Sequence, residues 1–263
     1  MMHPGTERVE ETIRRRRGFL TALRAGPRRK RELVEALETS RSTVDRAVGD
    51  LLEAGLVTET TEGVAITLAG RMAAAIDATY LRRIAALSDA LEPLAAIDGQ
   101  VSIDDSFLVD ARVEAASPHV PDLIIDRFYE SVAAATSVQA VVPMVLREHL
   151  LRFHEELTDR PVDVEMVVDR RVIDLLGADP EMAGVIDAVI GSDTIEVSAA
   201  ELPMRIGVWV TPTEAGVIVY TDTGPHSVLV NTRGAARRWA QTVYEAAATE
   251  SVPLERLLGG RGS

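Results

Sequence analysis

The side chains that could carry out catalysis or hold a metal ion do not form a recognisable catalytic pattern. His149 and His154 are five residues apart. This is about 140° on a helical wheel, so they suit a single metal ion poorly. Asp104 and Asp105 are better interpreted as acidic surface than as a carboxylate pair, and His226 lies in a Gly-Pro-His turn with no identifiable nucleophile. We therefore predict no catalytic residue and no metal site.

The composition excludes further classes of chemistry. The chain has 263 residues and no cysteine, which rules out disulfides, thiolate catalysis and cysteine-based zinc sites. It contains neither a glycine-rich P-loop nor a G-x-S-x-G sequence. We expect a protein that is not an enzyme and that needs no cofactor. The alternative is an enzyme with its site in the acidic C-terminal part, which turnover on a panel of metabolites would reveal.

A different chemistry is indicated at residues 41–46, where short polar and cationic side chains begin a predicted helix. Such groups, at the start of a helix that follows a tight turn, are typical of a recognition helix in the major groove of DNA. The helix itself is predicted over residues 41–54 from apolar side chains at helical spacing, namely Val44, Ala47, Val48, Leu51 and Leu52. Ser40 is placed as its N-cap.

The neighbouring elements complete a winged helix-turn-helix. A shorter helix is predicted over residues 30–37, separated from the second by a four-residue break. Residues 56–60 and 64–68, joined by a Thr-Glu-Gly turn, predict a β-hairpin, the wing. The alternative is a helical hairpin with an appended β-hairpin that never touches DNA.

The predicted partner is double-stranded DNA. Residues of the second helix are expected to reach base edges or phosphates, and those before the first helix to hold the DNA backbone. A wing residue near Thr60 or Thr61 is expected to hold the backbone as well. The complete set of candidate DNA-binding residues is Arg28, Arg29, Lys30, Ser40, Arg41, Ser42, Thr43, Asp45, Arg46, Thr60 and Thr61.

The segments SRSTVDRAVGDLLEAGLV and ITLAGR resemble the winged-helix domains of archaeal and bacterial regulators of the ArsR-like kind. The resemblance covers about residues 9–72. It implies a DNA-binding domain at the start of the chain.

The charge is unevenly spread. Residues 1–50 hold 12 basic and 8 acidic residues, out of totals of 28 and 41, so the remainder is strongly acidic. This charge distribution suits a protein that binds phosphate through its N-terminal part and repels phosphate elsewhere. Lys30 is the only lysine, and an acidic, lysine-poor surface is similar to that of halophilic archaeal proteins. The alternative explanation of the missing lysines is a GC-rich genome, which also replaces lysine by arginine. Neither a membrane span nor a signal peptide is visible, so we expect a cytoplasmic protein.

Two long helices are predicted around the winged-helix core. The first covers residues 6–25 and contains the basic run 14–17, which is either a solvated face or a phosphate contact. The second covers residues 69–91, and we expect Pro93 to end it. Its apolar stripe could pack on the C-terminal domain or on a second subunit, and we favour a dimer: Leu68, Met72, Ile76, Tyr80, Ile84, Leu87 and Leu91.

Beyond residue 93, strand and helix signals alternate, which predicts an α/β domain with a mostly parallel sheet. A strand is expected near residues 107–115, and a β-pair at 205–210 and 217–220 makes the sheet mixed. Helices are expected at 123–135, 146–157, 171–176, 181–190 and 233–248, and further strands at 139–143, 162–168, 194–198 and 227–230.

This region resembles the C-terminal domain of archaeal regulators of the methanogenesis-regulatory and filament-regulator type, and more distantly TrmB-type sugar sensors. The resemblance rests on AVVPMVLREHLLRFHEEL, VDVEMVVDRRVIDLL and SAAELPMRIGVWVTPTEAGVIVYTDTG, and covers about residues 93–254. It implies a phospholipase-D-like fold that senses a small molecule. The histidine–lysine pair of phospholipase-D enzymes is absent, because Lys30 lies in the DNA-binding half.

A ligand site in an open α/β sheet is expected at the carboxyl ends of the strands. The candidate residues there are Pro143, Met144, Asp169, Arg170, Leu202, Pro203, Thr221 and Asp222. Each also has a purely structural interpretation, as a strand terminator or a turn residue.

Together these observations predict a two-domain, dimeric transcriptional regulator. Residues 1–70 form the winged helix-turn-helix, residues 71–92 the linker and dimerisation helix, and residues 93–263 the α/β domain that senses an effector of unknown identity. The alternative from another class is a protein-interaction module whose winged helix binds a protein partner.

Overall fold

The computed structural model describes residues 4–97, 103–116, 123–145, 150, 152, 162–180 and 182–259. The chain divides into two compact units, Met1–Ile84 and Ala85–Ser263. The predicted two-domain organisation, with a winged helix-turn-helix followed by an α/β domain, is confirmed in outline. The boundary between the units, after Ile84, falls inside the predicted linker helix over residues 71–92.

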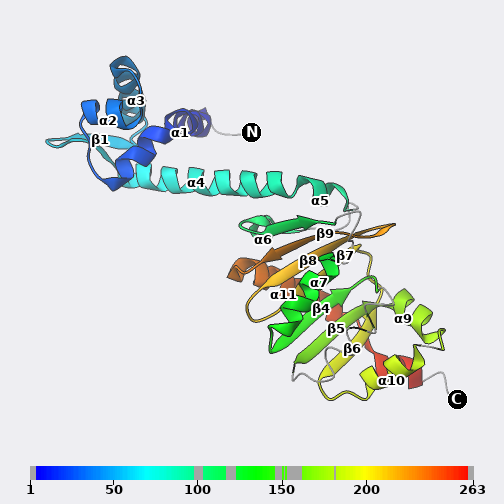
Figure 1. Cartoon of the computed structure of the whole chain (residues 1–263). Coiled ribbons are helices and arrows are strands. Elements are labelled where there is room, and N and C mark those ends of the chain that lie inside the picture. The colour runs from blue at the N-terminus through cyan, green and yellow to red at the C-terminus, as the bar shows by residue number, and fades with distance from the viewer. Residues whose placement is uncertain are drawn as a thin grey trace. The chain divides into compact units, whose positions relative to one another are not determined.

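The first unit contains a helix-turn-helix followed by a β-hairpin (Figure 1). Its elements begin and end within about three residues of the predicted positions. They are α1 (Pro4–Ala22), the short 3-10 helix η1 (Leu23–Ala25), α2 (Lys30–Ala36), α3 (Arg41–Glu53), β1 (Val57–Thr60), β2 (Gly63–Ile66) and the greater part of α4 (Leu68–Asp89).

The core of the first unit is built from the apolar face of α3. Val44, Ala47, Val48 and Leu51 are all buried, which confirms the helical periodicity read from the sequence. They pack with apolar side chains of α1, α2 and the hairpin. A third backbone segment pairs with the hairpin, because Arg28 and Val64 exchange two backbone hydrogen bonds of 3.0 and 2.9 Å. The segment that precedes α2 is thereby fixed against the wing.

The second unit is an α/β domain around one large sheet. Its helices are α5 (Leu91–Ala95), α6 (Asp105–Leu108), α7 (Leu123–Ala133), α9 (Arg170–Gly177), α10 (Ala183–Ile190), α11 (Gly234–Thr249) and α12 (Leu254–Gly259). Its strands are β3 (Arg112–Ala115), β4 (Ser137–Val142), β5 (Asp163–Asp169), β6 (Ile195–Ala200), β7 (Ile206–Val210), β8 (Ala215–Thr221), β9 (Gly224–Asn231) and β10 (Val252–Pro253).

The sheet has the order β10-β6-β5-β4-β7-β8-β9-β3. It is mixed, as predicted, but the expectation of a mostly parallel sheet is wrong. Only the β4–β5 and β5–β6 pairs are parallel, and the other five are antiparallel. The reason is that β7, β8 and β9 follow one another through short turns, which can join only antiparallel neighbours.

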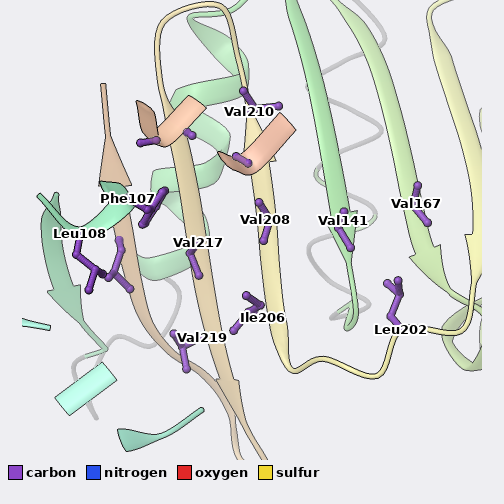
Figure 2. Packing of buried hydrophobic residues seen from close by; sticks show 14 of the residues in the cluster. Phe107, Leu108, Val141, Val167, Leu202, Ile206, Val208, Val210, Val217 and Val219 are labelled. Atoms are coloured by element: carbon purple, nitrogen blue, oxygen red, sulfur yellow. The ribbon is translucent and has the colours of Figure 1, made fainter. Parts of the chain in front are cut away.

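Each face of the sheet carries its own core, because successive side chains of a strand point to opposite faces. Val208 packs in the core on the side of α6 and α11, whereas the adjacent Trp209 packs on the side of α7. Figure 2 shows the first of these cores, in which Phe107 of α6 lies beside the strand residues Val208 and Val217.

Three boundary predictions need correction or fall outside the described residues. Pro93 does not end α4, which stops at Asp89; it lies in the first turn of α5, where a missing N–H leaves no intrahelical bond unmade. Phe107 belongs to α6 and not to a strand, since Asp104 caps that helix through the N–H of Ser106. The helix predicted over 146–157 lies almost entirely outside the described residues.

Candidate nucleic-acid interface and effector site

One face of α3 is free of the core and carries the polar side chains predicted for recognition. Arg41, Ser42, Asp45, Arg46 and Gly49 are all exposed, at the i, i+1, i+4, i+5, i+8 spacing of a single helical face. The buried residues of α3 occupy the opposite face. The helix-turn-helix therefore presents a polar surface that a DNA groove could receive.

Ser40 organises the start of this helix, as predicted for an N-cap. Its Oγ accepts a hydrogen bond of 3.2 Å from the backbone N–H of Thr43. It also lies 2.9 Å from the hydroxyl oxygens of both Ser42 and Thr43. Ser40 thus contacts both following hydroxyls and positions the first turn, and Thr43 is half-buried beside it.

Lys30 and Asp45 form an ion pair between α2 and α3, with Nζ 2.8 Å from Oδ1. The hydrogen bond from Lys30 lowers the pKa of Asp45 below its ordinary value. Both residues were predicted to contact DNA. In the free protein each is engaged by the other, so Asp45 offsets the one lysine charge close to the recognition helix.

Arg41 and Arg46 have no such partner. Within the part of the chain that the structure describes, no carboxylate forms an ion pair with either guanidinium. The basic run of α1 behaves differently, because Arg16 binds Asp50 of α3 and Arg17 binds Asp77 of α4, each through two N–H···O bonds of 2.6–2.9 Å. Arg16 and Arg17 therefore tie helices of the first unit together.

The wing is less suited to phosphate than the segment before α2. The wing exposes Glu59 and Glu62 beside Thr61, and the Thr60 hydroxyl donates to the carbonyl of Gly63 at 2.8 Å. Two carboxylates at the wing would repel a phosphate backbone. The exposed Arg29 and the half-buried Arg28 precede α2 and keep the positions predicted for backbone contacts.

Two of the predicted ligand residues at the strand ends have structural roles. Asp169 is 1 % exposed and accepts hydrogen bonds from Arg171 and from the N–H of Leu202. Burial would raise its pKa, but these hydrogen bonds outweigh burial and hold the pKa of Asp169 below its ordinary value. Leu202 itself is buried in the core drawn in Figure 2. Asp169 is thus the N-cap of α9 and Leu202 is a core residue, so each has a structural role.

The other strand-end candidates lie at the ends of β4, β5, β6 and β8, which run in the same direction and end at one edge of the sheet. Asp222 forms an ion pair with Arg205, and the Thr221 hydroxyl lies 3.0 Å from that of Thr223. Arg170 and Pro203 are exposed, and Pro143 and Met144 are half-buried. Of the eight candidates only Met144 borders a cavity, which lies between the sheet and α7, α9 and α10.

The histidines show no catalytic arrangement in the described residues. Nε2 of His226 lies 3.2 Å from Oε1 of Glu92, and its Nδ1 lies 3.3 Å from the Ser227 hydroxyl. His149 and His154 lie outside the described residues. Among those that are described, no three metal-binding side chains gather at one point, and no helix is long and apolar enough to cross a membrane.

The cavity was missed at the level of sequence because its walls come from segments far apart in the chain. A weak signal was present in β7 and β8, where Gly207, Trp209, Gly216 and Tyr220 alternate between glycine and large aromatic residues. Glycine within a strand marks a close approach of another group. Here the approaching groups are aromatic rings: a Cβ at Gly216 would lie 2.0 Å from a ring carbon of Trp209.

Several solved structures match the chain at low similarity. TrmBL2, described as an archaeal chromatin protein with a novel mode of DNA binding, has a TM-score of 0.41 and 10% identity over 90% of this chain and 92% of its own. Nuc from Salmonella typhimurium, a phospholipase D family member, has a TM-score of 0.42 and 11% identity over 55% and 98%. NucT from Helicobacter pylori has a TM-score of 0.44 and 10% identity over 55% and 99%. Scores this low carry no argument about function.

Family models give a firmer assignment, although no curated protein matches the chain. Residues 121–250 match the middle domain of the methanogenesis regulatory protein FilR1, which lies within the second unit. Residues 8–89 match the HVO_A0261 N-terminal domain, which includes the helix-turn-helix, the wing and α4. The second unit thus contains a region similar to the FilR1 middle domain over residues 121–250, and the first a region similar to the HVO_A0261 N-terminal domain over residues 8–89.

Proposed function

We propose that the protein is a transcriptional regulator that binds double-stranded DNA through α3 as a homodimer, and that its second unit senses a small molecule. The observation that carries DNA binding is the exposed face of α3, with Arg41 and Arg46 unpaired among the described residues. Arginine at this position can donate two parallel hydrogen bonds to guanine or bind a phosphate. The FilR1-type domain supports a regulatory role.

The contact would be made mainly by the recognition helix. The wing exposes Glu59 and Glu62, so it gives the backbone little electrostatic attraction. Base-edge and shape contacts by α3 would then carry a larger share of the affinity. A small share for phosphate contacts is consistent with the acidic composition of the whole chain, whose net charge is −13. It is also consistent with adaptation to high salt, which the resemblance to halophilic proteins suggests.

Dimerisation is supported by the apolar stripe of α4. Leu68, Met72, Ile76, Tyr80 and Ile84 are 46–66 % exposed, and Leu87 and Leu91 continue the stripe. No charged residue belongs to it, so two copies can pair without burying a charge. A two-fold interface uses the same patch on both subunits, and a dimer presents two α3 helices to two half-sites.

The sensing role rests on the FilR1-type domain, and the effector is a small molecule of unknown identity. We propose no catalytic reaction for this unit, since the histidine–lysine pair of phospholipase-D enzymes cannot form in a chain whose one lysine is Lys30.

The test of this proposal is binding to the DNA upstream of the protein's own gene. A labelled upstream fragment and a scrambled fragment of the same base composition are titrated with the full chain at several salt concentrations. The upstream fragment should bind at least tenfold more tightly, and that ratio should persist as salt rises because base contacts are less salt-dependent than phosphate contacts. Equal binding to both fragments would contradict the proposal and favour a protein partner for the winged helix.

A further inference from the structure

The second unit contains an apolar cavity of about 140 Å³. It lies on the face of the sheet that packs against α7, and β4, β7 and β8 contribute to its floor. Among the described residues, those that line it are apolar or aromatic or are glycines, and none is charged; the wall includes Phe128, Ala140, Met166, Val189, Ile218 and Tyr220.

The cavity is partly open and not an enclosed void. It still leaves more free space than a protein interior packed at nearly crystalline density. An apolar cavity of roughly 150 Å³ in another protein stays dry and takes up benzene. The size and lining of this cavity therefore suit a ligand with about one aromatic ring and no charge.

Two residues of the wall carry a donor without a hydrogen-bond partner among the described residues: the buried indole Nε1 of Trp209, and the hydroxyl of Tyr220. Tyr220 is 5 % exposed, and no residue that the structure describes forms a hydrogen bond with its hydroxyl. Burial raises the pKa of Tyr220, so the phenol stays protonated and able to donate near neutral pH. The hydroxyl is not one of the fully buried side-chain atoms, so a ligand or a water molecule in the cavity can accept a hydrogen bond from it.

The position of this ring is fixed by its neighbours. It lies against Gly207 of β7, where an added Cβ would stand 3.3 Å from a Tyr220 ring carbon and 3.6 Å from its hydroxyl oxygen. Glycine therefore leaves room for the ring within the sheet face. Beside it, the Trp209 ring meets Phe128 of α7 edge-on, with 5.5 Å between ring centroids.

We propose that this cavity binds a small, uncharged, largely apolar molecule with one hydrogen-bond acceptor, and that the Tyr220 hydroxyl donates to that acceptor. The proposal deepens the sensing role and rests on it for its biological meaning. Binding of a small molecule to the cavity can be measured without DNA. Failure of this proposal is therefore distinguishable from failure of the proposed DNA-binding function.

The test uses two probes of nearly the same shape, acetophenone and ethylbenzene. Only acetophenone carries a carbonyl oxygen. Each is titrated into the full chain, and affinity is taken from calorimetry and from the rise in unfolding midpoint. Both probes should bind, with acetophenone about three- to tenfold tighter, the range expected for one hydrogen bond.

Tyr220→Phe separates the contribution of the hydroxyl to affinity from that of the apolar cavity. Because the hydroxyl has no partner to lose, this variant should fold like the wild type. Acetophenone affinity should fall to that of ethylbenzene, while ethylbenzene affinity stays unchanged. The matched control is Tyr244→Phe, because the Tyr244 hydroxyl donates to Glu165 at 2.8 Å and Tyr244 packs with the core on the α11 side. Tyr244→Phe should preserve the difference in affinity between acetophenone and ethylbenzene.

Ala140→Leu tests the cavity itself. Ala140 is buried and lines the cavity, so a larger side chain there should reduce the affinity of both probes at least tenfold. The proposal is overturned if neither probe binds the wild type, or if Tyr220→Phe leaves the preference for acetophenone intact.

Discussion

Lys30 Nζ lies 2.8 Å from Asp45 Oδ1, so the only lysine of the chain is paired with a carboxylate on the exposed face of α3. The pair joins the two helices of the helix-turn-helix. It also sets the charge of the proposed interface, because Asp45 would stand close to the phosphates of any DNA that α3 approaches. Arg41 and Arg46 flank it on the same face.

Asp45→Asn should strengthen DNA binding. The substitution removes a negative charge from the proposed interface and frees Lys30 to contact a phosphate. We expect affinity to rise about three- to tenfold at low salt, and the slope of log affinity against log salt to steepen by about one. Asp187→Asn, an exposed change in the second unit, removes the same charge and serves as the control. An unchanged salt slope would mean that Asp45 does not face DNA.

Arg46→Ala should weaken binding to the upstream DNA by about 1–3 kcal/mol if Arg46 reads a guanine. The loss should then be confined to the specific fragment. A loss of similar size on specific and scrambled fragments would instead identify a phosphate contact. Arg238→Ala on α11, which removes an exposed arginine from the second unit, should leave both affinities unchanged.

Ile76→Asp should dissociate the dimer. Ile76 is 66 % exposed in the single chain, so the substitution should change the free energy of unfolding of the monomer by less than about 0.5 kcal/mol. Burying a carboxylate at a two-fold interface is unfavourable in both copies at once. Sedimentation equilibrium should show a dissociation constant at least tenfold higher. Ala75→Asp, an exposed change at the preceding position of α4, should have a much smaller effect. A wild-type chain that sediments as a monomer would contradict this account of the stripe.

Asp169→Asn should destabilise the protein in a pH-dependent way. Because hydrogen bonds from Arg171 and Leu202 hold its pKa below the ordinary value, ionised Asp169 stabilises the fold. This contribution is complete above the unfolded pKa of about 3.9 and is lost as the pH falls through the lower folded pKa. We expect a loss of about 1–3 kcal/mol at pH 7 that shrinks below pH 4 in chemical denaturation. Asp222→Asn, at an exposed ion pair with Arg205, should cost less than about 1 kcal/mol at any pH.

Gly216→Ala should destabilise the second unit, since the added Cβ would overlap the Trp209 ring, with 2.0 Å to its nearest carbon. Overpacking of this kind typically costs about 1–3 kcal/mol. Thermal unfolding measures the loss. Gly49→Ala in α3 is the control, because nothing lies within 4 Å of that position and alanine favours a helix. Equal stability of both variants would show that the Trp209 ring can move at little cost.

Local pattern predicted the first unit well. The apolar spacing of Val44 to Leu51 and the cap at Ser40 are properties of a few neighbouring residues, and the structure confirms both. Prediction was poorer where the outcome depends on distant partners. Leu202 looked like a strand-end ligand residue, but it is buried because its apolar side chain packs against strands far away in sequence.

The ligand site shows the same limit more strongly. Tyr220, Gly207 and Ala140 come together only after three strands are registered side by side, and no spacing in the sequence reports that register. Conversely, the ion pair between Lys30 and Asp45 could have been suspected from charge alone, but its geometry depends on the turn between α2 and α3.

The most direct measurement of the central claim is a hydroxyl-radical footprint of the full chain on the DNA upstream of its gene. Two α3 helices in a dimer should protect two short segments whose centres lie about 10 base pairs apart, or a multiple of that spacing. Arg46→Ala should weaken both protections together, and Arg238→Ala neither. A uniform pattern without any protected segment, at protein concentrations that saturate binding, would contradict the account.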